Sequence, residues 1–344
     1  MNSQQTLNID SETEADSVES FTIDLEEPIN VFSLEGYDYP AVVSGDSDSA
    51  DIYDWLERNR GFVEEQLLQK GALLFRGFRL AEKERFERFA AQACNQLIGN
   101  YADLPEESGT DVIYGSTPYP EDKTIYFHNE SSHLNQWPTK QFFACVTPSH
   151  TGGETPIVDC RVLYKELPQE FLAKCKQHGL LYIRNFIPGL DVSWQDFFKT
   201  ESKADVELAC QAENMQVEWG EFGRLKISKR VDAIKKHPVT GEDIFFNQIQ
   251  LHHPNFLNHS ERESLIELFG EEGLPRNVRF GDGSIISDEI ANELYDACVR
   301  NCVKFNWQKG DLLMVDNRII AHARLPFKGE RKILVAMGDL EKSI

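Results

Sequence analysis

Two segments that lie far apart in the chain carry side chains that could bind one metal ion. His128 and Glu130 stand two positions apart in YFHNESSH (126–133), and residues i and i+2 of a β-strand point to the same face. His322 lies in DNRIIAHARLPFKGERKILVAM (316–337), between an apolar strand and a turn. Two imidazoles and one carboxylate that leave coordination positions open suit non-haem Fe(II) and O₂. We therefore predict that His128, Glu130 and His322 bind Fe(II).

Other histidines near these segments are weaker candidates. A lone histidine near a strand is most often a core or surface residue, and an HxE triplet occurs by chance. His133 is five residues past His128, and we do not expect it to reach the same ion. His252 and His253 are adjacent, so their side chains diverge on an extended chain. The prediction therefore needs support from residues outside the triplet.

That support comes from a threonine and an arginine that could bind a carboxylate. Thr155 lies in GGETP (152–156), 155 − 130 = 25 residues past Glu130, and Arg331 lies 331 − 322 = 9 residues past His322. A guanidinium fork pairs with a carboxylate, and a hydroxyl adds a charge-assisted hydrogen bond. An arginine and a threonine behind a metal pocket suit the remote carboxylate of a dicarboxylate cofactor. We predict that role for Thr155 and Arg331.

Three further residues are predicted to contact a substrate. Arg324 lies two residues past His322 and on an extended segment would project toward the same pocket, where it could pair with a substrate carboxylate. Asn247, in FFNQIQLHH (245–253), and Ser132, just after the first ligand pair, are predicted to face the substrate. The alternatives are a surface salt bridge for Arg324 and a turn for Ser132.

The elements that must position these residues can be predicted from the pattern of apolar positions. Helical spacing predicts helices over 51–69, 81–98, 260–269 and 287–301. Short apolar runs between Pro, Gly and Asn turns predict strands over 72–78, 124–128, 141–146, 155–159, 180–186, 224–228, 244–248, 311–317 and 331–338. This order favours a mainly β fold with flanking helices (α+β), a sandwich or barrel. No strand–glycine loop–helix repeat supports a doubly wound nucleotide fold.

Composition limits the partners and the compartment. The formal net charge of −22 disfavours nucleic acid and anionic membrane surfaces. The seven cysteines form no CxxC pair, which favours free thiols in a reducing cytoplasm. Residues 1–27 are acidic and poor in large apolar side chains, so we predict a disordered tail ahead of one domain over 28–344. No signal peptide or membrane-spanning run is evident, and we predict a cytoplasmic protein whose oligomeric state stays open.

The combination HNE, GGETP and HARLPFKGER resembles the TauD/TfdA family of Fe(II)/2-oxoglutarate-dependent dioxygenases. Glu130, where Asp is commoner, is similar to clavaminate-synthase-like members. Three further segments are similar to the syringomycin-biosynthesis SyrP-like branch, and they span residues 137–164, 182–198 and 237–248. The resemblance covers about residues 70 to 340.

This resemblance implies a distorted double-stranded β-helix, or jelly roll, with the metal and cofactor between its sheets. It implies Fe(II) on His128, Glu130 and His322, and 2-oxoglutarate with its far carboxylate on Thr155 and Arg331, with O₂ as co-substrate. The expected substrate is an amino acid or an amino-acid-derived small molecule, free or tethered to a carrier protein, in natural-product biosynthesis. Related halogenases lack the carboxylate ligand, so Glu130 favours hydroxylation.

Alternatives remain open at this point. The same oxidant serves desaturation or cyclisation. A Zn²⁺ hydrolase or isomerase could use the same triad, without O₂ and without a role for Thr155 or Arg331. A non-catalytic jelly-roll binding module would be expected to lose one of the metal ligands.

Overall fold

The computed structural model describes residues 29–45, 51–99, 101, 104–190 and 192–342. The predicted acidic tail over 1–27 lies outside these described residues. None of the described helices is both long and apolar enough to cross a lipid bilayer.

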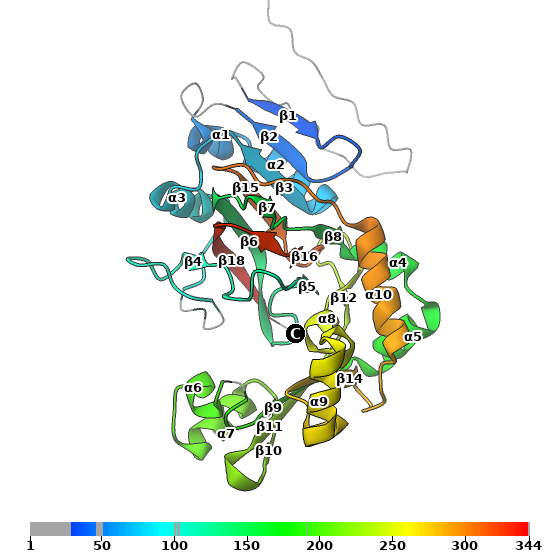
Figure 1. Cartoon of the computed structure of the whole chain (residues 1–344). Helices are drawn as coiled ribbons and strands as arrows, with labels where there is room; N and C mark the ends of the chain where they lie inside the picture. The colour runs from blue at the N-terminus through cyan, green and yellow to red at the C-terminus, as the bar shows by residue number, and fades with distance from the viewer. Residues whose placement is uncertain (1–28, 46–50, 100, 102–103, 191, 343–344) are drawn as a thin grey trace, which may run out of the picture.

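Seven strands form the largest sheet, whose order differs strongly from their order in the sequence. Across the sheet they run β1 (Asn30–Ser33), β2 (Ala41–Ser44), β3 (Ala72–Arg76), β15 (Leu312–Asp316), β6 (Gln136–Thr147), β18 (Lys332–Lys342) and β4 (Tyr114–Gly115). Only β2 and β3 pair in parallel. The C-terminal strands β15 and β18 flank β6, so both ends of the chain contribute to one sheet (Figure 1).

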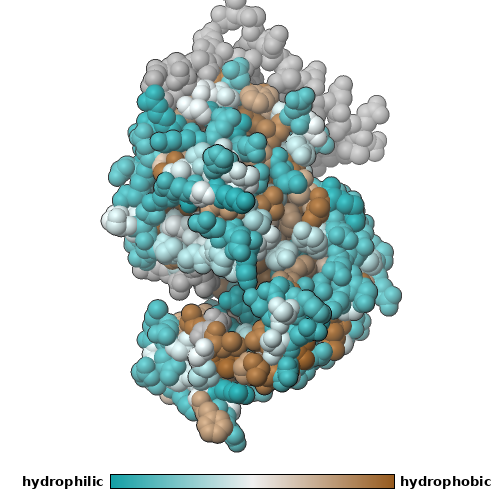
Figure 2. Space-filling view, viewed as in Figure 1, coloured by the Kyte–Doolittle hydropathy of each residue, from teal (hydrophilic) through white to brown (hydrophobic). Residues whose placement is uncertain are grey.

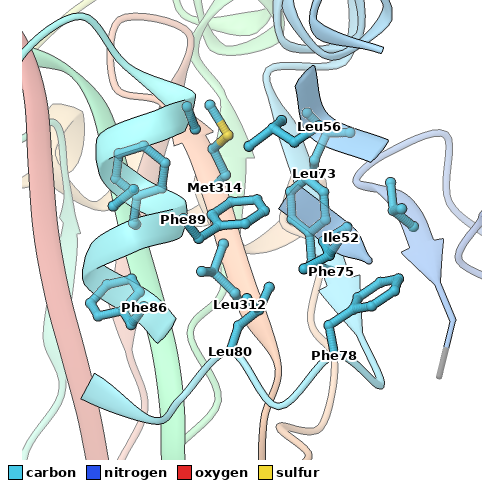
Figure 3. Close-up of a cluster of buried hydrophobic side chains, with 14 of the residues drawn as sticks. Ile52, Leu56, Leu73, Phe75, Phe78, Leu80, Phe86, Phe89, Leu312 and Met314 are labelled. Atoms are coloured by element: carbon cyan, nitrogen blue, oxygen red, sulfur yellow. The ribbon is translucent and has the colours of Figure 1, made fainter. Parts of the chain in front are cut away.

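Three helices cover one face of this sheet, α1 (Ile52–Arg58), α2 (Arg60–Lys70) and α3 (Lys83–Ala93). One continuous helix is predicted over 51–69, but the helix is interrupted at Asn59. The side chain of Asn59 donates to the carbonyl of Trp55. Phe75 of β3 and Phe89 of α3 pack edge to face at 4.8 Å, inside the apolar layer drawn in Figure 3. This layer makes the large sheet a rigid support for what lies on its other face.

A smaller set of strands faces the large sheet. It contains β5 (Ile125–His128), β16 (Ile320–Arg324) and β8 (Ile157–Asp159) in that order, and a separate pair, β7 (Thr151–Gly152) with β17 (Phe327–Lys328). Buried apolar residues of both sets form one core, among them Phe143 and Val335 of the large sheet and Ile157 and Ile320 of the small one. The expected jelly roll with flanking helices is confirmed.

Further helices pack behind the small sheet. They are α4 (Cys160–Glu166), α5 (Gln169–His178), α8 (Ile249–His252) and α10 (Asp288–Asn301), with the short hairpin β12 (Ile234–Lys236) and β13 (Asp243–Phe245). Of these helices only α10 matches a predicted one. The sequence analysis missed α4 and α5, which begin directly after a strand or at a proline, and α8, which is too short to show a period.

A four-stranded antiparallel sheet forms a separate lobe below the jelly roll in Figure 1. Its strands run β10 (Gln216–Trp219), β11 (Leu225–Val231), β9 (Leu180–Phe186) and β14 (Arg276–Phe280). The helices α6 (Trp194–Phe198), α7 (Lys203–Ala212) and α9 (His259–Phe269) accompany it. We call this sheet with α6 and α7 the small lobe.

Candidate active site

The pairing of β5 with β16 brings the two predicted histidine ligands together. His128 and His322 are directly opposite each other across these antiparallel strands, and their ring centroids are 4.3 Å apart. Glu130 follows two residues after His128, just past the end of β5. One ligand atom from each of the three residues lies within 4.8 Å of the others. The structure thus brings together the three side chains that were predicted from the sequence. Two imidazoles and one carboxylate at this separation match the ligand set of a facial metal site.

The two imidazoles are in the state that a metal ion needs. The Nδ1–H of His128 donates to the carbonyl of Tyr126 at 2.8 Å, which leaves its Nε2 lone pair for a ligand. Burial, and then the nearby His128, lower the pKa of His322 well below its usual value, so the ring is neutral. Nδ1 of His322 is buried and has no hydrogen-bond partner among the described residues. These features fit a bound cation better than a structural histidine, whose buried nitrogens are normally satisfied.

The carboxylate of Glu130 is held from two sides. The hydroxyl of Tyr101 donates to its Oε1 at 2.7 Å, and Nε2 of Gln141 lies 3.4 Å from its Oε2. Asn317 fixes the backbone of Glu130, because it accepts from the Glu130 N–H at 2.7 Å and donates to the Glu130 carbonyl at 3.0 Å. Tyr101 was not predicted as part of the site, because no spacing in the sequence connects it with Glu130. Such partners keep a carboxylate ligand oriented.

Arg331 and Thr155 meet at the edge of the site. Arg331 donates from Nε to the Gly153 carbonyl at 2.9 Å, and its Nη2 lies 3.4 Å from Oγ1 of Thr155. Trp307, a further residue that sequence reasoning missed, donates to the same Oγ1 at 3.1 Å. Since Oγ1 already accepts twice, the Thr155 hydroxyl hydrogen is left to donate to a ligand.

The guanidinium of Arg331 lacks a counterion among the described residues. Burial is the main cause that lowers its pKa to about 10, and the positive charge of Arg324 adds to the effect. The group therefore stays charged at neutral pH in a poorly solvated place. It forms no ion pair with any carboxylate of the described residues. An unpaired cation that is half-buried loses part of its hydration, and an incoming carboxylate would compensate for that loss.

The GGETP turn places Thr155 next to Arg331 through an unusual backbone. Gly153 has φ +74°, and a Cβ there would lie 2.5 Å from Oγ of Ser149 and 3.0 Å from Cδ and Nε of Arg331. We expect Gly153→Ala to displace the guanidinium and weaken 2-oxoglutarate binding about tenfold, beside a loss of about 1 kcal/mol in stability from the left-handed backbone. Calorimetric titration with 2-oxoglutarate and thermal unfolding measure the two effects.

Gly241→Ala is the matched control for this prediction. Gly241 has nearly the same φ, +70°, but a Cβ there meets nothing within 4 Å. It should show the stability loss alone. Equal 2-oxoglutarate affinity in the two variants would mean that the turn does not position Arg331.

The prediction that Arg324 contacts the substrate needs correction. Its guanidinium donates to three backbone carbonyls, those of Tyr119 at 3.1 Å, Pro120 at 2.6 Å and Lys123 at 2.8 Å. The pairing of β16 with β5 also shifts register here, with one extra residue on β5 between the partners of His322 and Arg324. Arg324 instead holds the segment of Tyr119 to Lys123 against β16 by these hydrogen bonds.

Asn247 and Ser132 also lie away from the open space near the metal ligands. Asn247 accepts from the N–H of Ile249 at 3.0 Å and donates to the Phe245 carbonyl at 3.3 Å, so its amide is used within its own turn. Its backbone N–H also bonds to the side chain of Asn129, between the first two metal ligands. Ser132 is 1% exposed and its hydroxyl has no partner among the described residues. Neither residue lines the cavity described next.

A cavity of about 560 Å³ opens onto His128 and Glu130 between the jelly roll and the small lobe. His128 and Glu130 are part of its wall, and so are aromatic side chains such as Tyr126 and Tyr182. Figure 2 shows apolar side chains gathered over the region of β9 and β14. Thr155 and Arg331 are not among the lining residues. A carboxylate at Arg331 would thus leave this cavity free for a second molecule.

Comparison with known proteins decides the family. The profile described as "Taurine catabolism dioxygenase TauD, TfdA family" matches residues 36–337. The chain belongs to the TauD/TfdA family. The resemblance seen in HNE, GGETP and HARLPFKGER is thereby confirmed.

Two curated proteins place the chain within the TauD/TfdA family. The dapdiamide synthesis protein DdaC of Enterobacter agglomerans is 34% identical over 307 residues, covering 89% of this chain and 93% of the relative. A clavaminate synthase-like protein of Arabidopsis thaliana is 29% identical over 323 residues, covering 88% and 94%. The narrower similarity to the SyrP-like branch stays a prediction.

Solved structures share the fold. A putative alpha-ketoglutarate-dependent taurine dioxygenase from Burkholderia xenovorans aligns with a TM-score of 0.51 at 18% identity, over 90% of each chain. A putative alpha-ketoglutarate-dependent 2,4-D dioxygenase from the same organism gives 0.51 at 16% identity, over 91% of this chain and 98% of that one.

As a TauD/TfdA enzyme, the protein is an Fe(II)/2-oxoglutarate-dependent dioxygenase, and its residues fit both cofactors. When bound, Fe(II) and 2-oxoglutarate convert O₂ into an oxidant for C–H bonds, with succinate and CO₂ as co-products. The protein's own contribution is positional. Tyr101, Gln141 and Asn317 orient the Glu130 carboxylate, and the buried strands β5 and β16 hold the two imidazoles.

Proposed function

We propose that the enzyme hydroxylates an unactivated C–H bond of an amino acid or of an amino-acid-derived small molecule. In this proposal His128, Glu130 and His322 bind Fe(II), while Thr155 and Arg331 bind the far carboxylate of 2-oxoglutarate. The observations that carry it are three ligand atoms within 4.8 Å of each other, and a half-buried arginine that contacts Thr155 and has no counterion among the described residues. A Zn²⁺ hydrolase would have no use for that arginine.

Two further observations support the choice of reaction and substrate class. Glu130 occupies the carboxylate position and is fixed by Tyr101 and Asn317, which leaves no room there for a halide and supports hydroxylation over halogenation. The relative from Enterobacter agglomerans is named for dapdiamide synthesis, which supports a role in the biosynthesis of a small molecule. Desaturation and cyclisation use the same oxidant with a different substrate position, and product analysis separates them.

A screen for substrate-dependent succinate release tests this proposal. Free amino acids and carrier-bound aminoacyl groups are incubated with Fe(II), 2-oxoglutarate and ¹⁸O₂. We expect at least one of them to stimulate succinate formation and to gain one labelled oxygen atom, as read by mass spectrometry. A product that has lost two hydrogens and gained no oxygen would show desaturation or ring closure instead. Absence of stimulation across both sets would contradict the proposed substrate class.

A further inference from the structure

The wall of the cavity opposite the metal ligands is cationic in a protein that is acidic overall. Arg184, Lys229 and Arg276 line the cavity, and Glu130 is the sole carboxylate among the described lining residues. The chain as a whole has a formal net charge of −22. A local excess of positive charge in a low-dielectric cleft attracts anions, whatever the net charge of the protein.

The three cations come from adjacent strands of the small lobe. Arg276 of β14 is directly opposite Arg184 of β9, and Lys229 of β11 is opposite Tyr182, two residues before Arg184. Because side chains alternate along a strand, all three lie on one face of the sheet. This face of the sheet therefore presents three cationic side chains to the cavity.

The surroundings show how each cation is held. The guanidinium of Arg184 lies over the rings of Phe186 and Phe197, at 4.6 and 4.4 Å from their centroids. Lys229 is 4% exposed and pairs with Glu213 at 3.0 Å. Arg276 is exposed and forms no ion pair with any described carboxylate, so its charge is the one most available to a ligand.

Two neutral histidines adjoin the same wall. His133 and His252 line the cavity with ring centroids 5.5 Å apart. Burial, followed by the charges of Lys229, Arg276 and Arg184, lowers the pKa of His133 to about 3, so its ring is neutral. The positive charge of this part of the cavity therefore comes from the arginine and lysine side chains.

We propose that this wall binds an oxyanion of the substrate, with Arg276 and Arg184 as the charged contacts. The inference rests on the proposed function and extends it. The substrate would be a carboxylate or phosphate compound, anchored on the small lobe at the far side of the cavity from the iron. The atom that is oxidised would then lie between the anchor and His128 and Glu130.

Binding of matched acid and amide pairs tests the proposal. The probes are the proteinogenic amino acids with their primary amides, and 4′-phosphopantetheine with pantetheine. They are titrated into the anaerobic protein loaded with Fe(II) and 2-oxoglutarate, and dissociation constants come from calorimetry. We expect the member that carries the carboxylate or phosphate to bind about tenfold or more tightly than the partner that lacks it.

Three variants test whether the cationic wall causes the preference for the probe that carries the carboxylate or phosphate. Arg276→Gln should abolish it, and Arg276→Lys, which keeps the charge, should restore part of it. Lys226→Gln is the matched control, because Lys226 lies on β11 with its side chain on the other face, paired with Glu218. It should keep the full preference.

Each outcome bears on the proposal. A preference for the amino acids identifies a carboxylate of the substrate, and a preference for phosphopantetheine identifies a phosphate on a carrier arm; both support the oxyanion site. Equal binding of every pair, or a preference that survives Arg276→Gln, overturns it. If the wild-type protein fails to form its Fe(II)–2-oxoglutarate complex at all, the proposed function fails, independently of the wall.

Discussion

Replacing Arg331 with glutamine is expected to weaken 2-oxoglutarate binding about 100-fold, which corresponds to about 3 kcal/mol. The guanidinium is half-buried and paired with no described carboxylate, so the cofactor's far carboxylate would be its counterion. Glutamine keeps hydrogen-bonding capacity but loses the charge and the fork. Fe(II) binding should change little, because Arg331 is not one of the three clustered ligands.

Calorimetric titration of the anaerobic Fe(II) protein measures this effect. Arg331→Lys is the informative companion, since it keeps the positive charge and loses the bidentate geometry. We expect it to fall between the wild type and the glutamine variant. Wild-type affinity in the glutamine variant would remove Arg331 from the cofactor site.

Replacing His322 with alanine is expected to abolish Fe(II) binding in the micromolar range and all succinate formation. Loss of a residue that merely orients a ligand costs about 10- to 100-fold in metal affinity, and loss of a ligand should exceed this. His322 is the member of the triad farthest in sequence from the other two, and it lies on the central strand of the small sheet. Equilibrium dialysis against Fe(II) without oxygen measures the affinity.

A second buried histidine controls for misfolding. His237 is 1% exposed, and its Nδ1 accepts from the backbone N–H groups of Val239 and Thr240. His237→Ala should lower the melting temperature and leave the Fe(II) affinity unchanged. If both histidine variants lost Fe(II) equally, the loss would reflect unfolding and not a missing ligand.

The meeting of the metal-site residues could be predicted from sequence because local rules govern it. The spacing of two residues between His128 and Glu130 points to a shared site, although Glu130 lies in a turn just past the end of β5. The apolar run after 311 marks the strand region that brings His322 opposite His128. The likeness to the TauD/TfdA family added the fold and the cofactors. Most predicted strands also appear within a few residues of their observed bounds.

What could not be predicted depends on contacts between distant segments. The guanidinium of Arg324 donates to the backbone carbonyls of Tyr119, Pro120 and Lys123, and no sequence pattern marks these contacts. Tyr101 and Trp307 reach Glu130 and Thr155 only because the fold brings their loops there. The cationic wall arises where β9, β11 and β14 pair, and Arg276 is 276 − 184 = 92 residues from its neighbour Arg184.

The central claim is that Fe(II) binds to His128, Glu130 and His322 and is chelated there by 2-oxoglutarate. Anaerobic spectrophotometric titration of the Fe(II) protein with 2-oxoglutarate tests it most directly. We predict a weak charge-transfer absorption band in the green that saturates at one 2-oxoglutarate per chain and is absent from the His322→Ala variant. A wild-type protein that binds both Fe(II) and 2-oxoglutarate without this band, or a band that persists without His322, would contradict the claim.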